Sequence, residues 1–203
     1  DEEFSYNWVY NFGLNGKQDG ANATASLDDH LFVGGYISNK KGIINRYLAK
    51  LRLSDGKELW NKVFPSKNFK TNSAYESLIL TSNKDLILTG VTNAKSGTFE
   101  GFKSYGNPTS GNLFVQYFSN SLIKQTISPE KPTWSIEIKG LLTGKAIKES
   151  SVENAFLIAS STQDEPAITN IVKINRNGKI IWSKNFPDHG EVTDITISNI
   201  KGK

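Results

Sequence analysis

The residues best suited to chemistry are two histidines and one pair of adjacent acids. His30 closes an Asp-Asp-His run whose nitrogen and oxygen atoms are of the kinds that bind metal ions. His189 would need an orienting partner to act as a general acid or base, and the sequence identifies none. The Asp164-Glu165 pair offers oxygen ligands for calcium but lacks the spaced ligands of a calcium-binding loop. We therefore expect residues 28–30 to form a solvated hairpin turn, and we assign no catalytic residue, metal ligand or cofactor.

Aromatic residues gather in one stretch that no predicted strand requires. Residues 95–106 carry three rings among glycines and serines, and the nearby run 67–70 adds a fourth. Rigid rings with adaptable polar neighbours are typical of contact surfaces. The alternative is that these rings cap the core of their own unit. As a contact surface, the candidate partner-binding residues are Phe99, Phe102, Lys103, Tyr105 and Phe69.

The composition argues against several function classes. The chain has 203 residues, no cysteine and a net charge of +4. Without cysteine it has neither a disulfide nor a thiolate metal site. Its charges are interspersed, which is typical of a solvated surface and not of a nucleic-acid interface. No apolar run reaches the roughly 20 residues of a membrane helix, and no nucleophile-elbow, phosphate-loop or zinc-protease motif occurs.

A repeat centred on tryptophan organises the chain. Residues 50–65 and 173–187 share a pattern in which a glycine precedes the tryptophan by four residues and an aromatic-proline pair follows it. Trp134 begins a looser third copy, and Trp8 fits the end of a fourth. Regular self-similarity of this kind indicates stacked or radial repeats. We expect the indoles to pack at blade edges or between repeats, with each N–H on a carbonyl, rather than to form ligand platforms.

Each repeat predicts four short strands, and helix is expected to be scarce. The first strands are predicted at 21–27, 74–81, 145–150 and 192–198, the second at 31–37, 86–91 and 155–159, and the third at 47–51, 113–117 and 171–174. The fourth strand carries the tryptophan. Gly56 and Gly178 supply the positive φ angles of tight hairpin turns. Gly34-Gly35 predicts a bulge or close backbone packing within a strand.

Four-stranded units of this size are typical of propeller blades. The predicted fold is all-β, a partial β-propeller of about three and a half four-stranded antiparallel blades. Its predicted parts are 1–12 (the outer strand of a preceding blade), 13–65, 66–138 and 139–187 (blades), and 188–203 (the start of a further blade). Insertions at 93–112 and 118–133 lengthen the middle blade as surface loops. We expect residues 1–203 to be a fragment or processed product that does not close a ring by itself.

The pattern Tyr-Leu-x-Lys-Leu-x-x-x-Gly-x-x-x-Trp-x-Lys covers residues 47–62 and, more loosely, 171–184. It resembles the blade repeat of bacterial-type surface β-propellers and, less closely, the quinoprotein-like (PQQ-like) propeller repeat. The quinoprotein motif usually has Ala and Asp six and four residues before its glycine. This chain has Lys50 and Arg52 there, and Ile174 at the second of these positions in the later copy. It also lacks the adjacent cysteines of some quinone enzymes, so the resemblance implies a propeller without a quinone site.

Together these features predict a non-catalytic binding or structural module, part of a larger propeller in a surface or exported protein. Its expected partners are a protein or glycan and the remaining blades of the same protein, with no nucleic acid and no membrane insertion. The expected location is extracellular or at the cell surface, with the periplasm and cytoplasm left open. Two alternatives remain: part of a quinone- or metal-dependent propeller enzyme, and an intracellular scaffold.

Overall fold

The structure is a computed structural model of the 203-residue chain. It describes residues 7–13, 18–65, 72–92, 102–105, 112–139, 143–150, 152–162, 168–187 and 190–197, of which 102–105 and 139 are described by their backbone. These residues form three sheets, each with four antiparallel strands that carry one tryptophan repeat, and one sheet gains a fifth strand that pairs in parallel.

The first blade contains four strands in sequence order. They are β1 (Gly20–Leu27), β2 (His30–Ser38), β3 (Ile44–Arg52) and β4 (Glu58–Phe64). The turn before β4 contains Gly56 at φ +68°, as the Asp-Gly pair predicts. The predicted close packing at Gly34-Gly35 is confirmed, because a Cβ on Gly35 would lie 2.0 Å from the carbonyl oxygen of Gly20.

The second blade has the same four strands and an added one. They are β5 (Ser73–Leu80), β6 (Leu86–Thr92), β8 (Asn112–Phe118) and β9 (Trp134–Lys139). The insertion at 93–112 is not simply a loop, since β7 (Phe102–Tyr105) pairs in parallel with the outer edge of β9. An unpaired edge offers free N–H and C=O groups, and β7 satisfies them. The second insertion contains a short helix, α1 (Asn120–Ile123).

The third blade repeats the plan of the first. Its strands are β10 (Thr143–Ser150), β11 (Ala155–Ser161), β12 (Thr169–Asn175) and β13 (Ile180–Phe186). Gly178 stands in the turn before β13 at φ +74°, which matches the turn of the first blade. Trp60, Trp134 and Trp182 therefore occupy fourth strands in all three blades, as the repeat predicts.

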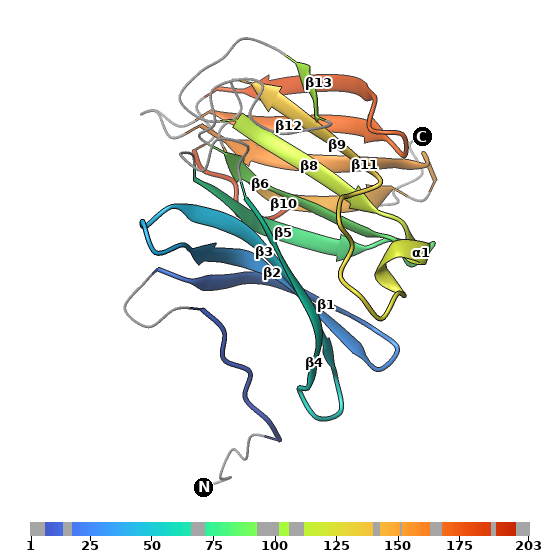
Figure 1. Ribbon diagram of the computed structural model, residues 1–203. Helices are drawn as coiled ribbons and strands as arrows, with labels where there is room; N and C mark the ends of the chain where they lie inside the picture. Colours follow the sequence, from blue (N-terminus) through green and yellow to red (C-terminus); the bar gives the residue numbers. More distant parts are fainter. Residues whose placement is uncertain are drawn as a thin grey trace, which may run out of the picture.

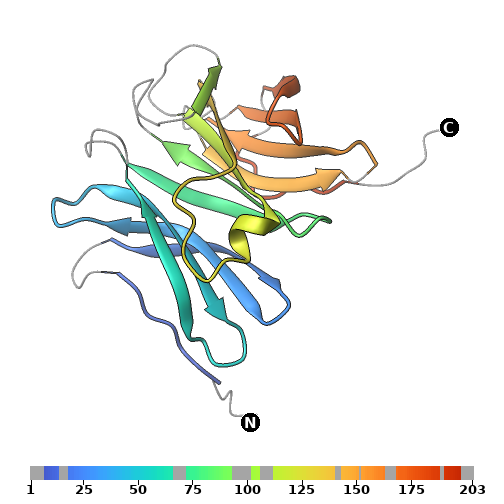
Figure 2. The same cartoon turned by 45° about the vertical axis from the view of Figure 1, so that its right-hand side comes forward.

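The three sheets spread like a fan from their first strands. β5 packs against both β1 and β10, whereas β4 and β13 lie at opposite ends of the molecule (Figure 1). Figure 2 shows the first and third blades on opposite sides of the second. First strands that converge and fourth strands that diverge are the geometry of propeller blades around an axis. The fold is thus all-β, a partial β-propeller.

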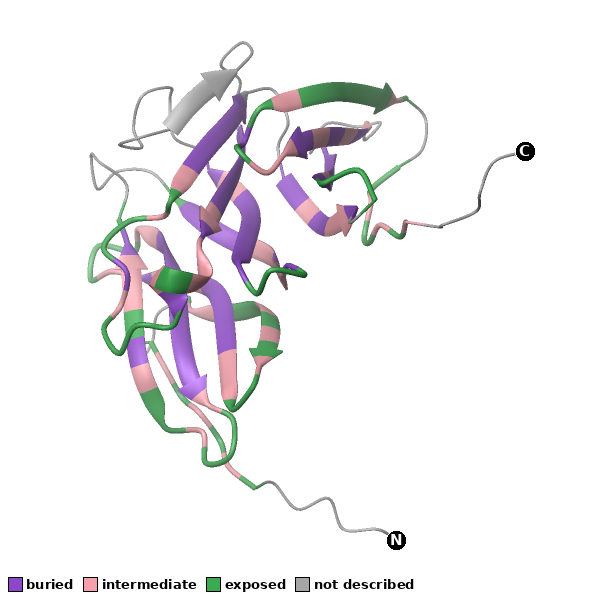
Figure 3. Cartoon of the chain, turned by 90° about the vertical axis from the view of Figure 1, so that its right-hand side faces the viewer, coloured by how far each residue is buried: buried purple, intermediate pink, exposed green. Residues whose placement is uncertain are grey.

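Hydrophobic cores lie between successive blades, where the sheets face each other (Figure 3). The core between the first and second blades includes Phe32, Leu48, Trp60 and Phe114. A second core, rich in isoleucine and valine, joins the second and third blades. The outer face of the first blade is covered by aromatic side chains of the segment 7–12. The cores of the described residues therefore lie between a sheet and the sheet or segment next to it.

The strands predicted at the two ends of the chain are not formed among the described residues. Residues 7–12 and 191–197 have no strand assignment, although residues 7–12 do pack their aromatic rings on the first blade. A β-strand needs a hydrogen-bonded ladder with a neighbour. Among the described residues neither segment has a neighbouring strand with which to build one. The predictions of a fourth strand at Trp8 and a first strand at 192–198 therefore stay predictions.

Candidate binding site

Three tryptophans make structural contacts with a blade outside their own segment, as predicted. Trp8 donates its indole N–H to the carbonyl of Leu53 (2.9 Å), and Trp134 donates its own to the carbonyl of Arg176 (2.9 Å). Trp60 reaches the carbonyl of Gln125 at 3.3 Å. In each case the acceptor lies between the third and fourth strands of the following blade. These rings are therefore occupied by packing and are not ligand platforms.

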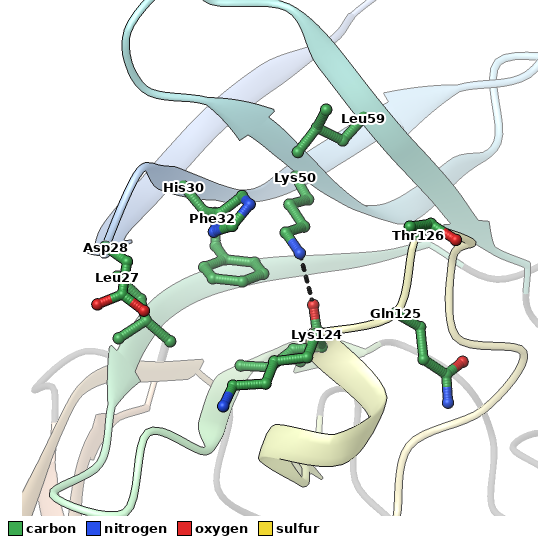
Figure 4. A pocket seen from close by; sticks show the side chains of 10 residues that line it. Leu27, Asp28, His30, Phe32, Lys50, Leu59, Lys124, Gln125 and Thr126 are labelled. Carbon is green, nitrogen blue, oxygen red and sulfur yellow. Dashed lines mark hydrogen bonds between the residues drawn. The ribbon is translucent and has the colours of Figure 1, made fainter.

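An open cavity of about 520 Å³ lies where the first blade meets the segment after α1. Leu27, Phe32, Leu59 and Ile123 provide its apolar walls, and Asp28, His30, Lys50 and Gln125 are among its polar lining groups. Figure 4 shows the side chains arriving from β2, β3 and β4 on one side and from the end of α1 on the other. A concave, mostly apolar site with a few convergent polar groups is the usual form of a ligand pocket.

Lys50 is the central charged group of this cavity. It stands on β3 between Phe32 on β2 and Trp60 on β4, so the alternation of β3 directs it to the same buried face. Only 4% of its surface is exposed. Its Nζ donates to the carbonyl of Ile123 at 3.0 Å and lies 5.9 Å from the centre of the Phe32 ring. Burial lowers the pKa of the Lys50 ammonium, because the charged form loses hydration.

The chemistry of the cavity suits an anionic group on an apolar stem. The Lys50 ammonium has three N–H donors, and the structure shows one carbonyl acceptor for them. A carboxylate entering between Phe32 and Leu59 would accept from Lys50 while its carbon chain contacts the walls. A charge-assisted hydrogen bond of this kind is roughly twice as strong as a neutral one. The arrangement therefore favours recognition of an acid.

A second polar feature runs along the inner strands. The first strand of every blade has one extra residue opposite its neighbour, a β-bulge, at the same place. The bulged residues are Asn22, Glu76 and Lys145. Burial raises the pKa of the Glu76 carboxyl, and the charge of Lys145 opposes that shift. Lys145 also pairs with Glu191 at 2.9 Å. The inner edge thus displays an amide, an acid and a base in a row.

The sequence-predicted contact residues are only partly described. Phe102, Lys103 and Tyr105 lie on β7, whose backbone is placed at the outer edge of the second blade. Phe99 and Phe69 lie outside the described residues. The structure therefore brings three of the five positions onto one edge strand and leaves the predicted surface itself a prediction.

Of the sequence-predicted titratable residues, the structure describes those of the 28–30 turn. His30 begins β2 and lines the cavity near Asp28. His189 and the Asp164-Glu165 pair lie outside the described residues. Within the described ranges, no three His, Asp or Glu side chains gather closely enough to hold a metal ion. No helix of the described part of the chain is long and apolar enough to cross a membrane.

The main charged groups of both polar features were not among the residues predicted from the sequence. Lys50 drew notice only as a departure from the quinoprotein pattern, yet a lysine inside the apolar run Tyr47-Leu48-Ala49-Lys50-Leu51 is a signal of a buried charge. Glu76 and Lys145 break the alternation of their strands, and this break is the sequence trace of a bulge.

No protein-family model and no curated protein matches the chain. Among solved structures it has a slight likeness to the acylaminoacyl peptidase of Pyrococcus horikoshii, with 8% identity over 87% of this chain and 33% of that chain and a TM-score of 0.31. BamB from Moraxella catarrhalis has 10% identity over 87% of this chain and 68% of that chain, with a TM-score of 0.22. The chain spans about a third of the length of the peptidase. The propeller assignment rests on the sheets themselves.

Proposed function

We propose that this part of the protein is a non-catalytic binding module that recognises a protein partner through an acidic side chain. The cavity beside α1 would receive that side chain, with Lys50 as the charged contact. The observation that carries the proposal is a buried ammonium in an open, apolar-walled cavity. A buried charge has a high desolvation cost, which an anion entering the cavity would partly offset.

The walls support an acid with a carbon stem rather than a bare ion. Phe32 and Leu59 face the approach to Lys50, and their apolar surface would contact methylene groups. Glutamate side chains and chain-terminal carboxylates have this form. An extracellular or cell-surface setting, which the repeat resemblance implies, belongs to the same proposal and is tested by fractionating the cells that produce the protein.

Nuclear magnetic resonance titration with simple probes tests the cavity. Hexanoate, hexanol and hexylammonium share one apolar chain and differ in charge. We expect hexanoate to shift amide signals of β2, β3 and the 123–126 segment, hexanol to shift them weakly, and hexylammonium to leave them unchanged. Lys50→Met keeps the stem without the charge and should abolish the hexanoate response. The matched control is Lys41→Met at an exposed lysine of the β2–β3 hairpin, which should respond as the unaltered protein does.

Two titration results would contradict the proposal that Lys50 recognises an acid. Equal responses to all three probes would mean that the cavity selects apolar chains and not acids. Hexanoate binding that survives Lys50→Met would remove Lys50 from the recognition. The non-catalytic part of the proposal has its own test: replacing His30 and His189 together by Gln should leave any activity of the natural protein intact. A loss above about a hundredfold, near 2.7 kcal/mol of barrier, in a folded variant would refute it.

A further inference from the structure

A second open cavity, of about 530 Å³, lies next to the Lys50 cavity. All of its lining residues belong to the segment 119–133, which joins the third and fourth strands of the second blade. Gln125 lines both cavities, and Figure 4 shows its side chain pointing away from Lys50. The two cavities are therefore neighbours that share one residue as a wall. The apolar lining of the second cavity consists of Leu122, Ile127, Pro129 and Pro132.

Hydrogen bonds hold the first part of this segment in place. Its two ends are joined because the Ser119 amide donates to the Thr133 hydroxyl at 3.0 Å. The carbonyls of Ile123 and Gln125 accept hydrogen bonds from the first blade. The wall between the two cavities is thus formed before any ligand arrives, as is usual for binding sites.

The second part of the segment leaves its backbone groups available. Within the described part of the chain, residues 126–132 make no hydrogen bond. The side chain of Ile127 is 70% exposed. Free N–H and C=O groups beside an exposed apolar side chain suit an added extended peptide, whose main chain pairs with such groups while its alternate side chains enter pockets.

The two cavities differ in charge. The Lys50 cavity is lined by Lys50 and Lys124 and by one acid, Asp28. The second cavity is lined by Glu130 and Lys131, whose charges cancel. The first cavity is therefore suited to an anionic group, and the second to an uncharged apolar group that contacts its walls.

We propose that the two cavities together bind one extended peptide segment that has an acidic side chain and a large apolar side chain two residues away. The acid contacts Lys50, the apolar side chain enters the second cavity, and the peptide backbone pairs with free groups of residues 126–132. Side chains two residues apart in an extended chain lie on the same side and about 7 Å apart, which suits cavities separated by the single residue Gln125. The inference rests on the proposed function, to which it adds the second contact and its spacing.

A fatty acid is the other ligand that combines an acid with an apolar part. Its hydrocarbon chain would cover the free backbone groups of residues 126–132 and the hydroxyl of Ser128 without pairing them. Covering polar groups in this way costs free energy. A peptide backbone pairs with the same groups, so the second cavity favours a peptide.

Calorimetric titration of the natural protein that contains these residues, with capped pentapeptides, tests the inference. Gly-Glu-Ser-Leu-Gly and Gly-Leu-Ser-Glu-Gly have the required spacing in the two chain directions. Gly-Glu-Leu-Ser-Gly has the same composition with the acid and leucine adjacent, and Gly-Glu-Ser-Ser-Gly lacks the leucine. We expect the tighter of the first two to bind at least about tenfold more tightly than the peptide without leucine, because a buried leucine contributes that much. The peptide with adjacent acid and leucine should gain no more than about twofold.

Two exposed apolar residues provide a variant and its matched control. Ile127→Ser alters the second cavity at a side chain that packs little, so the fold should persist. It should cancel the gain from leucine and leave the affinities for hexanoate and for the leucine-free peptide unchanged. Val152→Ser, at an exposed valine in the turn between β10 and β11, should leave the gain intact. Lys50→Met should weaken the binding of every peptide.

The results distinguish the failure of this inference from the failure of the proposed function. If leucine adds nothing, if its gain survives Ile127→Ser, or if no peptide binds, the inference is wrong, while hexanoate binding that depends on Lys50 still supports the proposed function. Peptide and hexanoate binding that both persist in Lys50→Met would overturn the two together. Decanoate that binds more tightly than hexanoate, with that gain lost in Ile127→Ser, would replace the peptide by a fatty acid.

Discussion

Trp60 and Trp182 occupy equivalent positions in the first and third blades. Comparing them therefore measures how much the contact of Trp60 with the next blade contributes to the free energy of unfolding. Replacing each by alanine in the 203-residue chain should destabilise the fold unequally. Their exposures of 5% and 41% differ by about a third of the ring surface. For an indole side chain of about 200 Å² at roughly 25 cal/mol per Å², that difference is worth about 2 kcal/mol. The hydrogen bond of Trp60 to the Gln125 carbonyl adds about 1 kcal/mol.

We therefore expect Trp60→Ala to lower the free energy of unfolding by about 3 kcal/mol more than Trp182→Ala does. Urea unfolding followed by far-ultraviolet circular dichroism measures both, since this signal does not depend on the tryptophan removed. The slope of free energy against urea must stay the same in both variants, so that the comparison reflects stability and not a changed unfolded state.

A difference below about 1 kcal/mol would refute the reasoning, because residual structure in the unfolded state accounts for only a few tenths. A larger loss at Trp182 than at Trp60 would show that β13 is packed in solution. Trp60→Phe removes the indole N–H and the pyrrole part of the ring, so its cost should lie between that of the hydrogen bond alone and that of Trp60→Ala. It keeps a six-membered aromatic ring and should cost at least about 1 kcal/mol.

Three further changes test separate parts of the structure. Gly178→Ala and Gly42→Ala both occur at positive φ, but only the first meets a ring, that of Trp134, so its unfolding free energy should fall by at least about 1 kcal/mol more. Glu76 has a raised pKa, so its protonation stabilises the fold at low pH and that contribution is lost as the pH rises through the folded-state value. Glu76→Gln should therefore be more stable than the unaltered chain near pH 7, with the gap closing below about pH 4 in urea titrations. Alanine at the three rings of the first insertion should weaken partner binding in a pull-down while the melting temperature stays nearly constant, and a fall in melting temperature with unchanged binding would assign the rings to the core. The three rings are Phe99, Phe102 and Tyr105.

The blade architecture could be predicted because its determinants are local. In the first and third blades the glycine turn fixes where a hairpin reverses, and the tryptophan four residues later marks the fourth strand. These two residue types define the repeat even where the residues between them differ. Strand positions in the three blades follow from short apolar runs between such turns.

Features that depend on distant pairing could not be predicted. β7 has four residues, and its parallel pairing with β9 joins positions more than 30 residues apart, so no local pattern marks it as a strand. The cavity around Lys50 arises because the 119–126 segment folds back onto the first blade. The hydrogen bond from Lys50 to the Ile123 carbonyl is part of that contact. Residues 192–198 have a strand-like composition, but a strand also requires a neighbour.

The three bulges allow the side chains of the inner edge to change during evolution without loss of strand pairing. A bulged residue lies outside the hydrogen-bonded ladder, so exchanging its side chain does not disturb the pairing of the strands on either side. Asn22, Glu76 and Lys145 show this directly, because neutral, acidic and basic side chains occupy one structural position. Mutation can therefore change the side chains of the inner edge one blade at a time while the strand pairing stays the same.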